Sequence, residues 1–343
     1  MKAVIINNFG DLDVLELIDI EEPKIGPNEV LIRIKAVSIN HIDIWIRRGI
    51  NIRPKLPHIL GADISGIVID KGSEVKNVEI GDEVILAPAI SCNNCYECIS
   101  GNDNFCRSYS ILGEHVWGGY REYINIRSEF VFKKPKNLNF IESASFPLVF
   151  LTAYNALIIR GNLSRDEVIL IMSGGSGVGS SAIQIAKKLV NAYVITTVGS
   201  DEKIQKAYEI GADYVINWKK TEIIEEIKSK FGRIDMVLDH TGKMHLNNLI
   251  KIVKNGGRII SYGATSGHLA EIDLRHIFYR QVSIIGSTMG RRADLIKIIN
   301  YFENQLFKPV IYKVLPLEDV KEGHRIIESG EVFGKVVLEL WMF

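Results

Sequence analysis

The sequence has no excess of charge of either sign. Lysine plus arginine and aspartate plus glutamate number 41 each in 343 residues, so the net charge is zero. Without a net positive field, the overall charge gives no reason to expect binding to nucleic acid or to an anionic membrane surface. We therefore expect a small-molecule substrate as the partner, with no nucleic acid and no membrane involved.

Long hydrophobic runs are also lacking. The longest apolar run, residues 146–159, is interrupted by Pro147, Thr152 and Asn155, and it is shorter than the roughly 20 residues that a membrane-spanning helix needs. The N-terminal stretch MKAVIINNFGDLDVLEL has neither the apolar core nor the cleavage site of a secretory signal. These two absences predict a cytoplasmic protein, and its length allows two domains.

Cysteine is scarce and confined to one stretch, CNNCYECISGNDNFC, which contains Cys92, Cys95, Cys98 and Cys106. Four thiolates at this spacing can surround one Zn²⁺ ion, whereas two disulfides or four unrelated thiols are the alternatives. Stable disulfides are rare in a reducing cytosol. Four protein ligands leave no coordination position for water or substrate, so the stretch predicts a structural zinc ion in a lobe at residues 92–106.

The apolar pattern changes along the chain. Short strand-like runs at residues 29–39, 63–70 and 82–88 indicate a β-rich, barrel-like domain. Near its end, Asn139 followed by Glu142 resembles a capping box, which predicts a helix from Asn139 through Ala156.

Six further strand-like runs, separated mostly by helix-like stretches, lie at residues 168–172, 193–198, 214–216, 235–239, 258–263 and 282–287. Strands alternating with helices predict a parallel, doubly wound sheet of the Rossmann type. The predicted fold class is α/β, with a β-rich domain formed by residues 1–147 and 288–343 and a six-stranded Rossmann domain at 148–287.

A glycine-rich turn follows the first of these six strands. Its sequence is SGGSGVG, from Ser173 to Gly179, and it opens a predicted helix. Glycines at such a turn let backbone N–H groups approach a pyrophosphate, which the helix N-terminus also attracts. The cofactor-binding residues predicted here are Gly174, Gly175, Ser176, Gly177, Val178 and Gly179.

The end of the second strand bears on the choice of cofactor. An acidic residue there would bind the ribose 2′-hydroxyl of NAD, but the strand ends at Val198, Gly199 and Ser200, with Lys203 one turn into the next helix. A hydroxyl and an ammonium suit a 2′-phosphate, so Ser200 and Lys203 predict NADPH in preference to NADH. In the alternative, Lys203 is a solvated lysine and Asp201 serves NAD.

Together these features resemble the medium-chain dehydrogenase/reductase superfamily, in which a GroES-like catalytic domain is joined to a Rossmann domain. The most specific elements are the cysteine lobe, the glycine turn and the segments SINHIDIWIRRG (38–49) and LPHILGADISGIV (56–68). The resemblance implies a homodimer or homotetramer. It also places Thr152 against the nicotinamide and Trp218 near the adenosine, with core packing as the alternative for Trp218, and we include Gly263 in the cofactor site.

The chain departs from the zinc alcohol dehydrogenases of that superfamily at their catalytic metal. Where those enzymes have zinc ligands, this chain has Asn40, Ala62 and Leu148, and Ile42 replaces the hydroxyl that relays the alcohol proton. The same segments resemble the zinc-independent quinone oxidoreductases and enoyl reductases, which typically show N-x-x-D, here Asn40 to Asp43, and G-x-D. That branch usually lacks the four-cysteine lobe.

The resemblance therefore implies hydride transfer from NADPH to a quinone or an α,β-unsaturated carbonyl without catalytic zinc. The catalytic residues implied are Asn40 as hydrogen-bond donor, His41 toward the cofactor pyrophosphate and Asp43 as an orienting group. A turn or capping role is the alternative for Asn40. Two other functions stay open: an alcohol dehydrogenase with a rebuilt zinc site involving His41 and Asp63, and an NADPH-binding protein with little catalysis.

Overall fold

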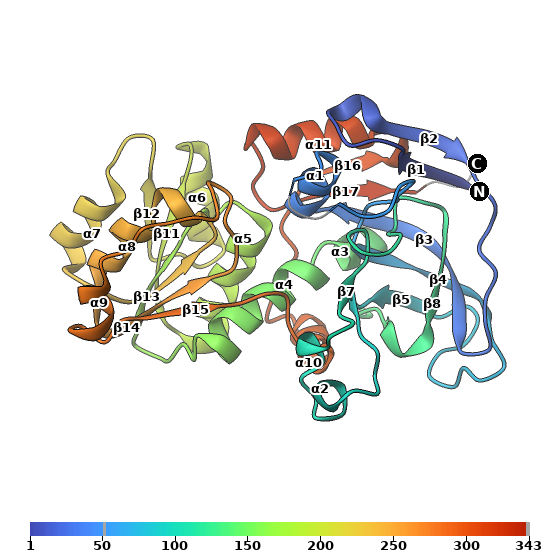
Figure 1. Cartoon of the computed structure of the whole chain (residues 1–343), viewed down its shortest axis with the longest axis horizontal. Coiled ribbons are helices and arrows are strands. Elements are labelled where there is room, and N and C mark those ends of the chain that lie inside the picture. Colours follow the sequence, from blue (N-terminus) through green and yellow to red (C-terminus); the bar gives the residue numbers. More distant parts are fainter. Residues whose placement is uncertain (51–52, 341–343) are drawn as a thin grey trace. The chain divides into compact units, whose positions relative to one another are not determined.

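The computed structural model describes residues 1–50 and 53–340, and these form two compact units (Figure 1). The first unit combines Met1–Leu148 with Arg291–Phe343, and the second is Val149–Gly290. The first is mainly antiparallel β-structure and the second is a parallel sheet with helices, which confirms the predicted α/β class with a GroES-like and a Rossmann-type domain.

The first unit is built on a seven-stranded sheet in the order β16-β17-β3-β4-β5-β9, with β8 also paired to β3. Every pairing is antiparallel except that between β16 and β17. The small pairs β1–β2 and β6–β7 complete it. The strands are β1 Lys2–Ile6, β2 Leu15–Asp19, β3 Glu29–Ile39, β4 Asp63–Lys71, β5 Glu83–Leu86, β6 Ala89–Ile90, β7 Ser110–Ile111, β8 Tyr123–Arg127, β9 Val131–Lys133, β16 Ile311–Pro316 and β17 Lys335–Glu339.

Short helices connect or cover these strands: α1 His41–Arg47, α2 Tyr96–Ile99, α3 Phe140–Ala144, α10 Arg292–Glu303 and α11 Val320–Ser329. The predicted capping box is present before α3, because the Glu142 N–H donates to Asn139 Oδ1 and the Asn139 N–H donates to Glu142 Oε2. The predicted continuous helix to Ala156 is wrong in its middle. Helix α3 ends at Ala144 and α4 (Pro147–Tyr154) begins at a proline, which has no N–H to continue a helix.

All six strands predicted for the second unit are present, in the parallel order β12-β11-β10-β13-β14-β15. They are β10 Val168–Ile171, β11 Tyr193–Val198, β12 Tyr214–Asn217, β13 Ile234–Asp239, β14 Val253–Ser261 and β15 Ser283–Gly286. The intervening helices are α5 Gly177–Gln184, α6 Glu202–Glu209, α7 Ile223–Phe231, α8 Leu246–Ile252 and α9 Leu274–Phe278, and α4 and α5 continue as π-helical turns at Asn155–Arg160 and Ile185–Val190.

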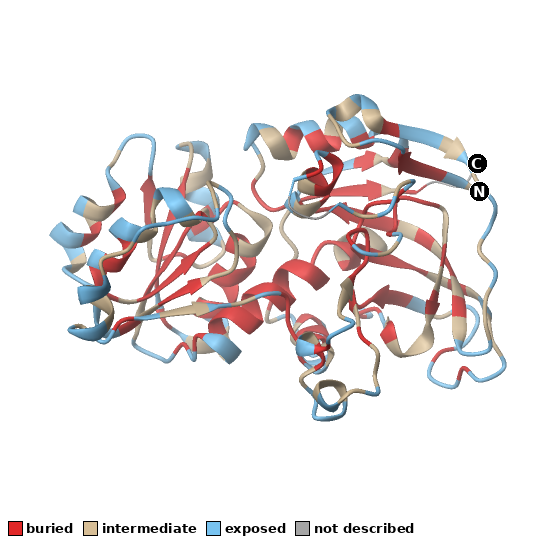
Figure 2. Ribbon diagram, in the orientation of Figure 1, coloured by how far each residue is buried: buried red, intermediate tan, exposed pale blue. Residues whose placement is uncertain are grey.

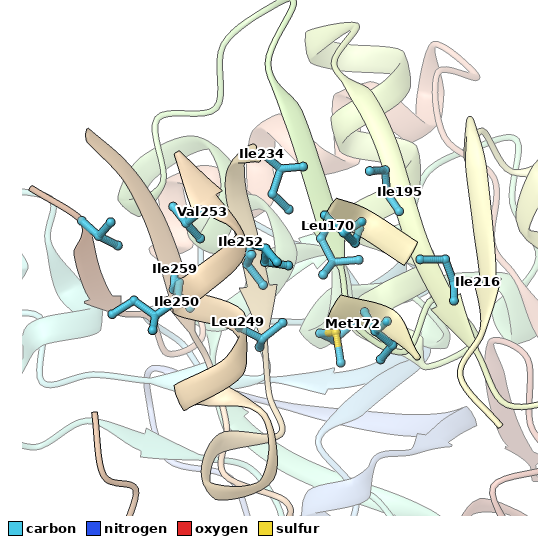
Figure 3. Close-up of a cluster of buried hydrophobic side chains, with 14 residues drawn as sticks. Leu170, Met172, Ile195, Ile216, Ile234, Leu249, Ile250, Ile252, Val253 and Ile259 are labelled. Atoms are coloured by element: carbon cyan, nitrogen blue, oxygen red, sulfur yellow. The ribbon is translucent and has the colours of Figure 1, made fainter. Parts of the chain in front are cut away.

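The core of the second unit lies between the sheet and helices α7 and α8. Leu170 and Ile195 from the strands belong to the same buried cluster as Leu249 and Ile252 from α8 (Figure 3). The sequence of α7, IIEEIKSKF, places Ile223 and Ile227 one turn apart, so both are buried on one face. Figure 2 shows the central strands buried and the outer faces of the helices exposed. This packing holds the carboxyl ends of the parallel strands at one edge.

Among the described residues, the structure has no helix that is both long enough and apolar enough to cross a membrane.

Candidate functional site

The four cysteines converge in the first unit. Their sulfur atoms all lie within 4.8 Å of one another, with separations of 3.5 Å for Cys95–Cys98 and Cys92–Cys106 and 3.9 Å for Cys92–Cys98. These distances are too long for disulfides. Four Zn–S bonds of about 2.3 Å at tetrahedral angles would separate the sulfurs by about 3.8 Å. The donor set therefore fits a structural Zn²⁺ ion.

Asn40, Asp63 and Lys335 form a buried polar cluster elsewhere in the same unit. Asn40 Nδ2 donates to Asp63 Oδ2 at 2.9 Å, and Lys335 Nζ donates to Asn40 Oδ1 at 2.5 Å and to Asp63 Oδ2 at 3.3 Å. Burial lowers the pKa of Lys335, and the charges of Asp63 and Asp43 oppose that shift. Since a buried charge must be paired, Asp63 is the counter-ion of Lys335.

Asp43 is hydrogen-bonded to the backbone around this cluster. Its carboxylate accepts the Asn40 N–H at 2.7 Å and the Gly61 N–H at 3.0 Å, which joins the start of α1 to the loop before β4. Burial raises the pKa of Asp43 to about 6, although both backbone hydrogen bonds act to lower it. Asp43 thus binds two backbone groups of the chain itself.

His41 and Asp63, the residues considered for a rebuilt metal site, do not come together in a group of three or more metal-ligating side chains among the described residues. Asp63 Oδ2 also accepts from Ser38 Oγ at 3.1 Å and Asp63 Oδ1 from the Leu148 N–H at 2.7 Å, so four donors already surround the carboxylate. His41 is exposed and stacks edge-on against Trp45. Over residues 1–50 and 53–340, the cysteines are the one group of three or more metal-ligating side chains close enough to share an ion.

A chain of buried polar groups extends from helix α1. Tyr120 Oη lies 3.2 Å from His324 Nε2, and Arg47 lies 3.3 Å from His324 Nδ1 and donates to Glu328 at 2.7 Å. Arg47 is fully buried, so this side chain belongs to the core. Burial, together with the Arg47 charge, lowers the pKa of His324 to about 3.

Glu114 is a buried carboxyl group that the sequence analysis did not select. Its Oε2 has no hydrogen-bond partner in the described chain and lies 3.8 Å from His115 Nδ1. That nitrogen accepts the Ile111 N–H at 3.1 Å, so it is not protonated and cannot donate to Glu114. Burial, with a smaller contribution from the charge of Asp43, raises the pKa of Glu114 to about 7.

The glycine turn of the second unit has the geometry of a phosphate-binding turn. A Cβ on Gly174 would lie 2.3 Å from Thr196 Oγ1, and one on Gly179 would lie 2.2 Å from the Ser173 carbonyl, so both positions require glycine. Ser176 is the N-cap of α5 and accepts the Gly179 N–H at 3.0 Å. The first N–H groups of the helix, at Gly177 and Val178, then remain for an anionic ligand.

Asp201, the residue that would serve NAD in the alternative interpretation, lies after the end of β11. Asp201 accepts hydrogen bonds from Asn217 at 2.6 Å and from Lys220 Nζ, and these bonds lower its pKa. The carboxylate of Asp201 thus already accepts hydrogen bonds from two neighbouring side chains. Trp218 is 49% exposed and packs over Gly199, where an added Cβ would lie 3.3 Å from its Nε1. Its exposure argues against the core-packing role.

His240 is a further polar group at the edge of the parallel sheet where the strands have their carboxyl ends, and the sequence analysis missed it. It follows β13 directly, its Nδ1 lies 3.2 Å from Thr265 Oγ1, and its Nε2 is buried without a partner in the described part of the chain. Gly263, after β14, packs against it, since a Cβ there would lie 3.2 Å from that of His240. Thr152 is buried on α4, with its hydroxyl 3.7 Å from Met289 Sδ.

Comparisons with known proteins identify the family. Residues 26–136 match the family described as alcohol dehydrogenase GroES-like domain, and residues 177–304 match that described as zinc-binding dehydrogenase. The NAD-dependent alcohol dehydrogenase of Sulfolobus acidocaldarius is 30% identical over 99% of this chain and 100% of its own length. The chain belongs to the medium-chain dehydrogenase/reductase superfamily.

Other members of the superfamily extend the comparison. The chloroplastic NADPH-dependent alkenal/one oxidoreductase of Arabidopsis thaliana is 30% identical over 98% of this chain and 79% of its own length. A solved structure described as an NAD-dependent alcohol dehydrogenase is 43% identical, with a TM-score of 0.94, and the match covers 99% of this chain and 100% of that one. This medium-chain dehydrogenase/reductase is an NAD(P)H-dependent oxidoreductase.

The Glu114 carboxyl predicts how the stability of this oxidoreductase depends on pH. Its pKa in the folded protein, about 7, lies above its ordinary value of 4.5, so its favourable contribution is present below pH 4.5 and is lost as the pH rises through 7. Between pH 5 and pH 8 the wild type should therefore lose roughly 2 kcal/mol of unfolding free energy that the Glu114→Gln variant keeps.

Urea unfolding of both proteins at the two pH values measures this difference. Glu21→Gln, at an exposed position, is the control and should follow the wild type. An identical pH dependence in wild type and Glu114→Gln would mean that Glu114 is ionised throughout.

Proposed function

We propose that this protein is an NADPH-dependent reductase of quinones or α,β-unsaturated carbonyls that acts without a catalytic metal. The observation that carries the proposal is the buried ammonium of Lys335, bonded to both Asn40 and Asp63. A second cation at Asp63 would have to displace four hydrogen bonds and lie beside that ammonium.

The chemistry of conjugated acceptors suits such a site. Bound NADPH supplies a hydride and becomes NADP⁺. Addition of the hydride to the β-carbon of an enone, or to a quinone, leaves negative charge on an oxygen conjugated with the acceptor, and a proton from solvent then completes the reduction. Delocalisation lowers the demand for a Lewis acid, and a hydrogen-bond donor can stabilise the remaining charge. We assign that donor role to the Asn40 amide. Reduction of an isolated aldehyde concentrates the charge on one oxygen, which the zinc alcohol dehydrogenases stabilise with a metal ion.

The preference for NADPH is supported by the charges that surround the end of β11. Asp201 is neutralised by Lys220, and Lys203 and Lys219 add two further positive charges near Ser200 and Trp218. A carboxylate held in this way does not repel a 2′-phosphate as a bare one would. The plant relative whose name specifies NADPH and alkenals is consistent with both halves of the proposal.

Alcohol oxidation is the second candidate, because several of the similar proteins are named alcohol dehydrogenases. It would require a source of alkoxide stabilisation other than Ala62 and Leu148, which offer no ligand atom.

The predicted homodimer or homotetramer also stays a prediction. Strand β15 lies at an edge of the parallel sheet and offers a surface for contact between subunits. Exposed apolar side chains lie nearby in the sequence, at Leu274, Phe278 and Tyr279.

The cofactor proposal predicts the effect of one substitution. Lys203→Ala should weaken NADPH binding by about 1–3 kcal/mol, since a charge-assisted hydrogen bond to the 2′-phosphate is lost, and should leave NADH binding nearly unchanged. Calorimetric titration of both cofactors measures this. Lys206→Ala, one turn further along α6, is the matched control and should bind both cofactors as the wild type does. Equal weakening of both cofactors by Lys203→Ala would contradict the assignment.

The reaction proposal predicts substrate class and metal dependence together. With NADPH, the purified protein should reduce small quinones or enones, and a chelator mild enough to leave the cysteine-bound zinc in place should not change the rate. NADPH oxidation at 340 nm across quinones, enones, aldehydes and ketones provides the measurement. Simple alcohol oxidation that the chelator abolishes and Zn²⁺ restores, with no quinone or enone reduction, would establish the alcohol dehydrogenase instead. NADPH binding without turnover of any acceptor would indicate a binding protein.

A further inference from the structure

Lys335 begins β17 and is the buried cation at the centre of the polar cluster in the first unit. Its side chain is 5% exposed, and its only counter-ion within 4.0 Å in the described chain is Asp63. An ammonium has three N–H groups, and two of them are bonded, one to Asn40 Oδ1 and one to Asp63 Oδ2. A lysine buried to this extent is kept in place by its partners, which makes its position well defined.

The contacts of Lys335 determine how the Asn40 amide is oriented. Asn40 Oδ1 faces the ammonium, and Asn40 Nδ2 donates to the carboxylate of Asp63 at 2.9 Å. Turning the amide over would place its NH₂ group against a cation and its oxygen against an anion, so the observed orientation is strongly favoured. One N–H of Asn40 Nδ2 is then left without an acceptor in the described residues.

The charge on Lys335 also changes the strength of that N–H as a donor. A hydrogen bond from a cation to the amide oxygen withdraws electron density from the amide nitrogen, and hydrogen bonds in a low-dielectric interior reinforce one another in this way. Lys335 therefore makes the remaining N–H of Asn40 a better donor to a developing oxyanion than it would be with the same Asp63 bond and no ammonium on the amide oxygen.

We propose that Lys335 is a positioning residue for the reduction: it acts through Asn40, holding the amide as a polarised donor toward the carbonyl oxygen of the substrate. The role rests on the proposed quinone or enone reductase function. It differs from a purely structural role because loss of Lys335 should reduce turnover only while Asn40 is present.

A double-mutant cycle tests the proposal on the full-length protein. Lys335→Met, Asn40→Ala and the double variant are compared by kcat and KM for reduction of one quinone or enone with NADPH. Removing an oxyanion donor typically costs 10²–10³-fold in kcat, so we expect about 100-fold losses for each single variant, with KM for NADPH unchanged. The double variant should lie within about threefold of Asn40→Ala, because residues that act as one unit are not additive.

Two further variants separate positioning from structure. Lys335→Arg keeps the charge and should retain turnover within about tenfold of the wild type. Lys134→Met removes another buried lysine of the same unit, whose Nζ donates to the Leu138 carbonyl at 2.5 Å, and it should lower the melting temperature without lowering kcat. If Lys335→Met does not fold, Lys335→Gln replaces it, since its neutral amide still donates to Asn40, with an expected loss of about tenfold in kcat.

Losses that multiply in the double variant would overturn the proposal, as would wild-type kcat in a folded Lys335→Met or Lys335→Gln protein. A wild type that reduces neither quinones nor enones would overturn the proposed function and this role with it. An active wild type with multiplicative losses would overturn the positioning role alone.

Discussion

The buried ion pair between Lys335 and Asp63 is the interaction on which the candidate active site depends. It joins β17, near the end of the chain, to β4 near its beginning, and Asn40 completes it from the residue before α1. Removing one member would leave a charge buried without a partner, which typically costs about 3–5 kcal/mol. The same pair sets the direction of the Asn40 amide. Lys335 is also one of the four donors around the Asp63 carboxylate, which a metal ion at this place would need as a ligand.

The chain thus separates two roles that metal ions perform in related enzymes. The cysteine lobe supplies a closed four-sulfur donor set, whose chemistry suits a structural ion that contributes to folding. For the second role, the proposed function relies on the Lys335 ammonium and the Asn40 amide, because Ala62 and Leu148 offer no ligand atom. Under the proposed function, the four cysteines would hold the stabilising metal, and the Lys335 ammonium with the Asn40 amide would take the role of the electrophilic one.

Much of the fold could be predicted because it depends on local pattern. Strands β3 and β11 begin and end where the apolar runs do, and the cysteines gather because fifteen residues confine them. The predicted helix from Asn139 to Ala156 failed because a long apolar run concealed the break at Pro147. The polar cluster of Asn40, Asp63 and Lys335 could not be predicted from the sequence for a different reason. Lys335 and Asn40 are 295 residues apart, and a lone lysine at the start of a strand gives no sign that it is buried. The unpaired atoms of Glu114 and His240 likewise depend on packing that no spacing reveals.

The most direct test of this account is a crystal structure of the NADPH complex with diffraction data collected on both sides of the zinc absorption edge. The account predicts one anomalous peak per chain, centred among Cys92, Cys95, Cys98 and Cys106, and density for Lys335 Nζ bonded to Asn40 and Asp63. A second anomalous peak beside Asp63, with the Lys335 side chain turned away from it, would contradict the central claim that an internal ammonium takes the place of a catalytic metal.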